Sequence, residues 1–415
     1  MNKAAKPISS RNIKIAFALV TSLFFLWGFS YGLVDVMNAN FQTQLGVSKA
    51  QSGLVQMAYF GAYFIIAIPA SMVAGKMGYK GGIIMGLLLY AIGALMIIPA
   101  SNAHSFNFFL LAFFILACGL GSLETNANPY ITKLGDEKDS SFRLNLAQSF
   151  NGLGSFIGPI IGGKLLLSLS HGEASQNMQN IQIIYGVVAL VVIVVMVLFF
   201  ITRMPEGSEV SSEELASEEG KSSYGELFRF KHFSFGVVAQ FLYVAAQVGA
   251  GAFFINYVAE RWESLSHEKA AYFLSVALAL FLIGRVVTTP LMKKMSPDKL
   301  LGIYSTANVI LMVVLQFAHG LAAVIALWLV FFFMSISFPT IFSLALHNVP
   351  GRLVKKGSSL LVMSIVGGAI APSIMGALAD KFGMGASFLL LLPCFAYVAW
   401  YGFSGLSPAH KKQQA

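Results

Sequence analysis

Glu124 is an acidic residue inside a segment whose composition is otherwise apolar. It follows the largely apolar run 106–118, and Asn126 and Asn128 come after it without a turn signal. Placing a carboxylate at mid-membrane costs roughly 2.5 to 3.5 kcal/mol even on permissive insertion scales, so such a side chain usually faces a wet cavity or a partner. The stretch from Gly119 to Tyr130 is therefore a candidate functional site.

Two roles are open for this acid. It can be a structural carboxyl that is hydrogen-bonded to an amide such as Gln148 or Asn151, or a cavity acid that binds and releases a proton. Pro129 favours the second role: it cannot donate a backbone hydrogen bond, so it frees a carbonyl about one turn earlier, close to Thr125. Such a local break suits a polar-lined cavity more than a face in contact with lipid.

Asp35 is the second acid, and it ends the charge-free run 15–34. Trp27, Tyr31 and Asn38 project within about 80° of it on a helical wheel. In one interpretation Asp35 lies at the external helix end, in water and inert. In the other the helix continues through Asn38, and Asp35 lies in the outer half of a cavity, where burial disfavours the charged form and lets the side chain carry a proton.

Gln148 and Asn151 begin a polar stripe on the segment 144–169, which continues at Ser155. Amides contain both donors and acceptors, which is what vicinal hydroxyl groups need. Asn128 is a further candidate of the same kind. An adjoining stripe of small residues lets another helix approach closely; it consists of Gly154, Gly158 and Gly162.

Polar and aromatic residues on two other segments extend this candidate binding site. In the second half of the chain, the spacing of the stripe recurs at Gln240, Tyr243 and Gln247. Two roles are open for these residues: lining the binding site, or packing between helices. Trp27 and Tyr31 are suited to stack on the apolar face of a sugar ring, and equally suited to anchor a helix at the membrane interface.

Arg285 lies inside an apolar segment, nine residues before Lys294. We expect its guanidinium to extend to the cytoplasmic surface or to pair with a loop acid. The chain has no Gly-x-x-x-x-Gly-Lys-Ser/Thr loop, and its seven histidines lack ligand spacing. The sequence therefore predicts no metal, no cofactor and no enzymatic activity.

The composition places these residues in a membrane protein. Of the 415 residues 57% are hydrophobic and only 11% are charged, compared with about 25% charged in an average soluble domain. The formal net charge is +9, but the basic residues are spread along short loops instead of lying on one stripe, which argues against nucleic-acid binding.

Apolar runs of about 20 residues, the length that a bilayer core requires, predict an all-α membrane protein with twelve spans. With the N-terminus inside, most of the 27 Lys and Arg residues lie on the cytoplasmic side, which predicts that both termini are cytoplasmic. The expected spans are 15–41, 52–74, 81–100, 106–131, 144–169, 181–202, 233–258, 270–292, 300–318, 321–346, 357–380 and 385–406.

A long polar stretch, residues 203–232, divides the chain almost in half. Its central part, 206–219, contains six glutamates among serines, a composition that cannot bury enough apolar surface to fold alone. It predicts an N-terminal six-helix bundle at 1–202, a flexible cytoplasmic linker at 203–232 and a C-terminal six-helix bundle at 233–415. A regulatory binding segment is the alternative for the linker.

The two halves are repeats. Gly154, Pro159 and Gly163 recur 213 positions later, and Pro129 matches Pro339 at an offset of 210. Six spans followed by six spans of the same topology predict a parallel repeat about an axis along the membrane normal, with the substrate site between the halves near the midplane.

Several local strings resemble the fucose:proton symporter family of the major facilitator superfamily. They are LFFLWG at 23–28, LETNANP at 123–129, AQSFN at 147–151, FPTIFSL at 338–344, and GSS at 357–359 with Gly367 and Gly368. The resemblance covers nearly the whole chain. It implies that Asp35 and Glu124 are the proton-coupling acids and that Gln148 and Asn151 contact the sugar. The chain differs from the family's fucose carriers at 30–34 and at Phe338.

The resemblance and the polar stripe together predict a proton-coupled symporter that imports L-fucose or a closely related neutral hexose. We expect a monomer in a bacterial cytoplasmic membrane, with the sugar, protons and lipid as its partners. The alternative is a proton-driven drug or metabolite efflux antiporter, because residues 154–163 resemble the Gly-Pro motif of drug antiporters. An apolar, aromatic cavity would favour that alternative.

Cysteine labelling tests the predicted topology. Ser217→Cys and Lys356→Cys should react only with membrane-permeant thiol reagents, and Ser170→Cys should react from outside, because the basic loops place the first two positions in the cytoplasm. Labelling of Lys356→Cys by an impermeant reagent in intact cells would contradict the twelve-span topology.

Overall fold

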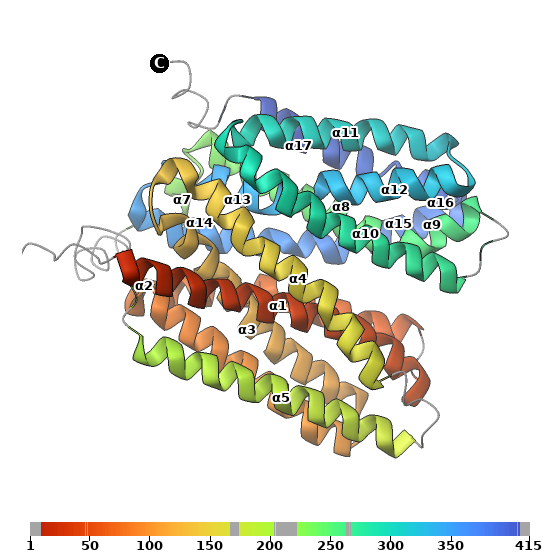
Figure 1. Cartoon of the computed structure of the whole chain (residues 1–415), viewed down its shortest axis with the longest axis horizontal. Coiled ribbons are helices and arrows are strands. Elements are labelled where there is room, and N and C mark those ends of the chain that lie inside the picture. The colour runs from red at the N-terminus through yellow and green to blue at the C-terminus, as the bar shows by residue number, and fades with distance from the viewer. Residues whose placement is uncertain are drawn as a thin grey trace, which may run out of the picture. The chain divides into compact units, whose positions relative to one another are not determined.

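The computed structural model describes residues 10–45, 47, 49–166, 174–202, 204, 222–262, 265, 267–404 and 406. The regular structure of these residues is helical, with no strand among them (Figure 1). The first half contains the helices α1 (Ser10–Gln44), α2 (Lys49–Asn102), α3 (Phe106–Lys133), α4 (Ser140–Leu166) and α5 (Ala174–Ile201), with the 3-10 turn η1 (Glu137–Asp139) before α4.

The second half is more often interrupted. Its elements are α7 (Tyr224–Leu227), α8 (Lys231–Ala252), α9 (Phe254–Arg261), α10 (His267–Thr288), η2 (Thr289–Lys293), α11 (Pro297–Phe317), α12 (Gly320–Met334), α13 (Ser337–Leu346), α14 (Gly351–Met363), η3 (Ser364–Val366), α15 (Gly367–Phe382), α16 (Met384–Phe388) and α17 (Leu391–Phe403).

The described helices account for the twelve predicted spans. Ten stretches are long and apolar enough to cross a membrane. One of them, Leu54–Asn102, has 49 residues and contains two predicted spans, separated by a kink at Gly78, where φ is 71° and ψ is 174°. Only glycine adopts that backbone conformation readily. Residues 144–166 of the fifth predicted span lie on α4, which is not one of the ten stretches; residues 167–169 lie outside the described residues.

The helices form two compact units. The first comprises Met1–Asp136, Phe150–Tyr224 and Pro350–Met363, and within it α2 packs along α3 and α5. The second comprises Glu137–Ser149, Gly225–Val349 and Ser364–Ala415, and within it α11 packs along α17, and α8 along α15 and α17. Each unit therefore includes a short segment from the other half of the sequence, and the division at 203–232 stays a prediction.

The described end of the predicted linker is ordered by contacts inside the first unit. The Tyr224 hydroxyl on α7 lies 3.2 Å from Ser71 Oγ and 3.4 Å from Ser359 Oγ. The Lys356 ammonium donates to the Ser222 carbonyl and hydroxyl. These contacts involve Ser222 and Tyr224 of the predicted linker. Residues 203 and 205–221 lie outside the described residues, and the flexible linker stays a prediction.

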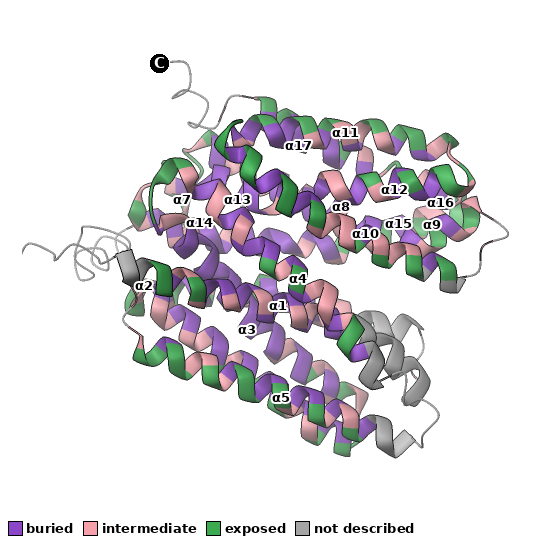
Figure 2. Cartoon of the chain, viewed as in Figure 1, coloured by how far each residue is buried: buried purple, intermediate pink, exposed green. Residues whose placement is uncertain are grey.

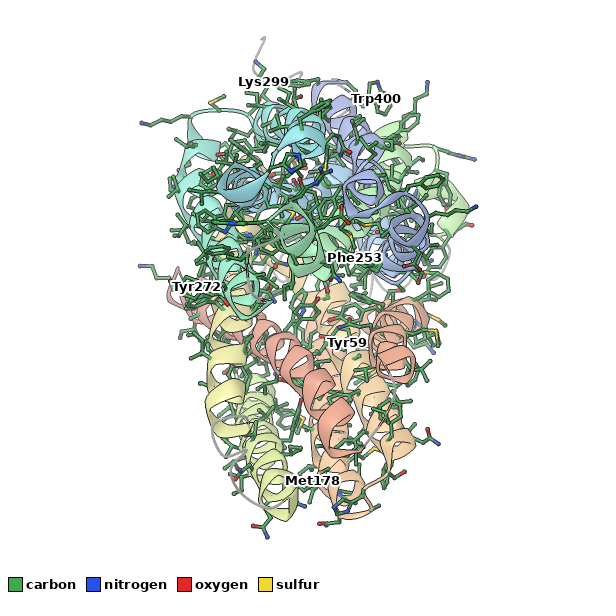
Figure 3. The ribbon with its side chains drawn as sticks, turned by 90° about the vertical axis from the view of Figure 1, so that its right-hand side faces the viewer. Tyr59, Met178, Phe253, Tyr272, Lys299 and Trp400 are labelled. Atoms are coloured by element: carbon green, nitrogen blue, oxygen red, sulfur yellow. The ribbon has the colours of Figure 1, made fainter. Side chains whose placement is uncertain are left out.

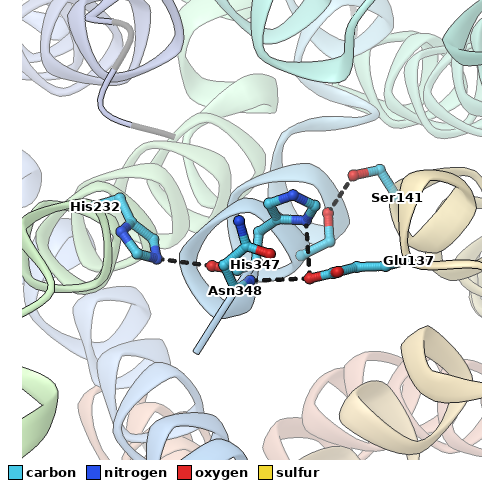
Figure 4. A network of polar contacts seen from close by, with 6 residues as sticks. Glu137, Ser141, His232, His347 and Asn348 are labelled. Atoms are coloured by element: carbon cyan, nitrogen blue, oxygen red, sulfur yellow. Dashed lines mark hydrogen bonds and ion pairs between the residues drawn. The ribbon is translucent and has the colours of Figure 1, made fainter. Parts of the chain in front are cut away.

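A polar network joins the segment 137–149 to the end of α13 inside the second unit (Figure 4). Glu137 Oε1 accepts the Asn348 N–H at 3.0 Å and lies 3.6 Å from His347 Nδ1. The His232 ring on α8 lies 2.9 Å from the His347 carbonyl oxygen. Asn348 has φ 56°, a left-handed conformation that asparagine tolerates better than most residues.

Apolar side chains cover one outer face of α5. Ile183, Val187, Leu190 and Val194 are exposed, and they recur every three or four residues, which places them on one side of the helix. Figure 2 shows exposed stretches along α5. A stripe of large exposed aliphatic side chains is unfavourable in water and suited to lipid hydrocarbon.

The predicted small-residue stripe on α4 permits close approach by α1. An ideal Cβ on Gly154 would lie 2.2 Å from the Phe25 carbonyl oxygen, and one on Gly158 would lie 2.5 Å from the Phe29 carbonyl oxygen. From the other side, a Cβ on Gly28 would lie 1.9 Å from the Asn151 carbonyl oxygen. These are contacts with backbone atoms, which cannot rotate away as side chains do.

Gly28→Ala should therefore destabilise the protein, because the added methyl group would force α1 and α4 apart. Overpacking of this kind typically costs about 1 to 3 kcal/mol. Thermal melting of the purified protein in detergent measures the effect. Gly186→Ala is the matched control, since nothing lies within 4 Å of its added Cβ and alanine is the better helix former. Equal melting temperatures for the two variants would contradict the close approach.

Candidate functional site

Glu124 lies in the most thoroughly buried part of α3. All residues from Leu116 to Ile131 are buried, and the Glu124 side chain is only 3% exposed. The Asn128 side chain, one turn later on the same helix, lies beside its carboxyl group. Among the described residues no cation pairs with it. An ionised carboxylate without a cation is unfavourable in such surroundings, so this acid needs a bound proton or access to a solvated cavity during function.

A group of tyrosines from α1 and α2 accompanies this acid inside the first unit. The rings of Tyr31 and Tyr59 lie edge to face at 5.7 Å, and those of Tyr59 and Tyr63 are 5.4 Å apart. Tyr59 and Tyr63 both lie near Glu124. Tyr59, labelled in Figure 3, is 2% exposed, and its hydroxyl has no hydrogen-bond partner in the described part of the chain.

Sequence reasoning named Tyr31 and missed Tyr59 and Tyr63. The signal was present in their spacing, because two tyrosines one turn apart in an apolar helix place two hydroxyl groups on one face. A buried hydroxyl without a partner is unfavourable unless water or a ligand satisfies it. Tyr59 therefore joins the candidate residues of this site.

Three other predicted residues belong to α1. Trp27 is 7% exposed, and its ring lies 5.3 Å from that of Phe24, so packing accounts for its position, and sugar stacking stays a prediction. Asp35 and Asn38 lie within the helix α1, but their side chains are outside the described ones. Their predicted roles therefore also stay predictions.

The carbonyl that Pro129 frees is that of Thr125, as the sequence predicts. The Ser358 hydroxyl on α14 donates to it at 2.5 Å, and Ser358 is fully buried. The helix α3 is continuous through Pro129, and a side chain from a distant helix supplies the donor that this proline lacks. Sequence reasoning located the freed carbonyl and missed its hydrogen-bond donor; the local helix break that it expected is not present, since α3 is continuous.

The predicted polar stripe on α4 has more than one role. The Asn151 amide donates to the Phe24 carbonyl at 3.2 Å, so this residue helps to hold α1 against α4. Further towards the start of α4, the Asn145 amide donates to Thr340 Oγ1 at 3.1 Å and to the Ser141 carbonyl at 2.9 Å. The Gln148 side chain is 3% exposed. Sugar contact by Gln148 and Asn151 stays a prediction.

On α8, Gln240 differs from the other two predicted residues. It is fully buried, and neither its amide nitrogen nor its amide oxygen has a hydrogen-bond partner among the described residues. The Tyr243 hydroxyl already donates to the Met334 carbonyl at 2.8 Å, and Gln247 is half-buried. A buried amide with both ends unsatisfied requires water or a ligand, which makes Gln240 the best ligand-binding candidate on α8.

The expectation for Arg285 is wrong. Its side chain is 3% exposed, so it does not extend to the surface. Nε donates to the Ser335 carbonyl at 2.7 Å, one terminal nitrogen donates to the Gln148 carbonyl, and the guanidinium lies 4.8 Å from the centre of the Phe281 ring. Carbonyl oxygens and a ring face, instead of a loop acid, surround this cation.

Comparison with known proteins identifies relatives along nearly the whole chain. The family model described as the Major Facilitator Superfamily matches residues 20–365. The L-fucose-proton symporter of Escherichia coli (strain K12) is 37% identical over 406 residues, which cover 94% of this chain and 92% of that protein. The glucose/galactose transporter of Brucella abortus biovar 1 (strain 9-941) is 35% identical over 400 residues, which cover 96% of this chain and 95% of that protein.

A solved structure has a similar fold. The crystal structure of the Major Facilitator Superfamily transporter FucP, in the outward conformation, aligns with a TM-score of 0.84 and 36% sequence identity, and the alignment covers 94% of this chain and 99% of that one. This similarity and the described helices agree with the predicted fold of twelve membrane helices in two six-helix parallel repeats.

Ser358→Ala should destabilise the protein, because it leaves the Thr125 carbonyl buried without a donor, at a cost of roughly 1 to 3 kcal/mol. Ser358→Ala should cost less in a Pro129→Ala background, because the alanine introduced at position 129 supplies the backbone N–H that proline lacks. Melting temperatures of the four proteins in this cycle measure the coupling. Ser373→Ala is the control, since Ser373 is exposed and its hydroxyl bonds only within its own helix. An equal loss in both backgrounds would contradict the assignment.

Proposed function

The chain belongs to the major facilitator superfamily, and from this premise we propose that it is a proton-coupled symporter that imports L-fucose or a closely related neutral hexose. Relatives that are 37% and 35% identical are named as an L-fucose-proton symporter and a glucose/galactose transporter, which supports both the sugar class and the coupling. The chain is a transporter and not an enzyme, in agreement with these relatives.

The observation that carries the proposal is the environment of Glu124. It is a buried acid without a cation among the described residues, and the Asn128 amide and two tyrosines lie near it. All of these groups can hydrogen-bond a neutral carboxylic acid, and none of them supplies the positive charge that a permanently ionised carboxylate would need. Such an acid is suited to gain a proton and lose it again in each cycle.

Proton binding and sugar binding are coupled if both stabilise the same conformation. A ligand shifts a conformational equilibrium only by its difference in affinity for the two states. In this proposal Glu124 is the cavity acid linked to sugar binding, and Asp35 is required for proton-driven turnover. Gln148, Asn151, Asn128 and Gln240 are the candidate hydrogen-bonding groups for the sugar hydroxyls.

The efflux alternative depended on the glycines of residues 154–163. The contacts of Gly154 and Gly158 with the backbone of α1 give these glycines a packing role that is independent of transport direction. The buried amides and the unpartnered Gln240 also favour a ligand with many hydroxyl groups over an apolar drug. These observations support the sugar symporter over the antiporter.

The remaining expectations belong to the same proposal. The chain is a multi-pass membrane protein, and we infer a bacterial cytoplasmic membrane with both termini in the cytoplasm from its basic loops. We further propose a monomer whose N-terminal bundle ends at residue 202 and whose C-terminal bundle begins at residue 233.

Glu124→Gln tests the proton-coupling role. The amide resembles the protonated acid in shape and hydrogen bonding but cannot release a proton. The variant should therefore keep sugar binding and sugar exchange between equal pools, lose accumulation against a gradient, and show a weaker dependence of sugar affinity on pH between about 5 and 9. The measurements are counterflow and uptake of labelled L-fucose in proteoliposomes, with an imposed pH gradient for uptake.

Asp380→Asn is the control, because Asp380 is exposed near the end of α15 and its loss removes the same charge outside the site. Normal accumulation by Glu124→Gln would contradict the assignment of this acid.

A panel of labelled hexoses with the unmodified protein tests the proposed function as a whole. Uptake driven by sodium and insensitive to pH would overturn proton coupling.

A further inference from the structure

Arg285 donates to a backbone carbonyl that a proline leaves without its helical donor. Pro339 has no N–H group, so the carbonyl four residues earlier, that of Ser335, loses its helical donor. The helix is interrupted at this point, since α12 ends at Met334 and α13 begins at Ser337. Arg285 Nε donates to this carbonyl at 2.7 Å. The guanidinium therefore replaces the backbone donor that Pro339 lacks.

The equivalent position in the first repeat shows that this task does not require a charge. Pro129 matches Pro339 at an offset of 210, and Thr125 matches Ser335 at the same offset. The Thr125 carbonyl receives its hydrogen bond from the neutral Ser358 hydroxyl. A hydroxyl group is therefore sufficient to satisfy a carbonyl freed by proline, and the buried arginine must be explained by something further.

The additional contact of Arg285 is with Gln148. A terminal guanidinium nitrogen donates to the Gln148 carbonyl on α4, and both residues belong to the second unit. A backbone carbonyl has two lone pairs, so Gln148 accepts this bond without losing its helical one. Among the described side chains no carboxylate contacts the guanidinium. Two carbonyl oxygens and the Phe281 ring are its partners.

A guanidinium is suited to hold two acceptors at fixed positions. It is planar, its donors have a rigid arrangement, and hydrogen bonds to a charged group are stronger than neutral ones. Arg285 thereby joins the break between α12 and α13 to the turn of α4 that carries the Gln148 amide. A lysine in its place would retain the charge and lose the fixed geometry of the two bonds.

We propose that Arg285 is a positioning residue for sugar binding, which acts by fixing the backbone of Gln148 against the helix break that Pro339 creates. The proposal rests on the function proposed above, in which the Gln148 amide binds a sugar hydroxyl. Arg285 itself does not contact the sugar.

A double-mutant cycle between Arg285→Lys and Gln148→Ala tests this role. Each single variant should weaken L-fucose binding by about tenfold, which corresponds to about 1.4 kcal/mol. The double variant should bind no more weakly than Gln148→Ala alone, because Arg285 acts only through that residue. Equilibrium binding of labelled L-fucose to purified protein gives the affinities, and melting temperatures report on folding.

A merely structural role for Arg285 gives a different pattern. Arg285→Lys would then lower the melting temperature and leave the affinity unchanged, or its effect on affinity would multiply with that of Gln148→Ala. Either result would overturn the proposal. Arg261→Lys is the matched control, since Arg261 also lies over an aromatic ring, that of Tyr257, and should leave sugar affinity unchanged.

A second pair of variants keeps the test decisive if Arg285→Lys does not fold. Pro339→Ala supplies a backbone N–H for the Ser335 carbonyl. Neither Pro339→Ala nor Pro339→Ala/Arg285→Gln therefore needs a side-chain donor at that carbonyl. The proposal expects the double variant to fold and still bind L-fucose about tenfold more weakly than Pro339→Ala alone. Equal affinities would overturn it. Failure of the unmodified protein to bind any hexose would instead overturn the proposed function.

Discussion

A proline inside a membrane-spanning helix frees a backbone carbonyl, and in a bilayer no water is at hand to satisfy it. The two matched prolines, Pro129 and Pro339, impose this requirement once in each repeat. Their carbonyls are satisfied by Ser358 and by Arg285. Because each donor comes from another helix, these carbonyls are points where separate parts of the chain are joined. Two candidate polar residues lie near these carbonyls. Glu124 immediately precedes Thr125, whose carbonyl Pro129 frees, and the Gln148 carbonyl accepts the second hydrogen bond of Arg285.

Close backbone contact between α1 and α4 is the second constraint on the site. Glycines on both helices leave no room for a Cβ where they cross, and the Asn151 amide adds a hydrogen bond to the Phe24 carbonyl. The polar face of α4 is thus held at a fixed distance from the helix that carries Tyr31. Side chains that bind a small ligand need such rigid support, because displacement by about 1 Å can greatly weaken an interaction that depends on geometry.

Much of the fold could be predicted from the sequence, because membrane helices have a strong hydropathy signal and the repeat is visible in its prolines and glycines. The freed carbonyl near Thr125 was also predictable, since the chemistry of proline is local. Its partner Ser358 was not, because that contact joins residues 233 positions apart and depends on tertiary packing. Tyr59 was missed because a tyrosine in an apolar span resembles an ordinary packing residue until its hydroxyl is found buried without a partner among the described residues. Arg285 was wrongly assigned to the surface because its distance from Lys294 suited a side chain that extends to the interface, whereas two carbonyl acceptors hold it inside.

Each unit contains a buried ionisable residue without an oppositely charged partner among the described residues, and the two residue types solve that difficulty differently. A glutamate can become neutral by taking up a proton, so the unfavourable burial of its charge is avoidable and its charge can change during a cycle. An arginine remains charged in proteins, so its burial must be compensated permanently by carbonyl oxygens and an aromatic ring. The first solution suits a group whose charge must alternate, which the proposed proton-coupling role requires of Glu124. The second suits a group whose hydrogen bonds must not depend on pH, so that Arg285 can hold its two carbonyls whether or not the acid is protonated.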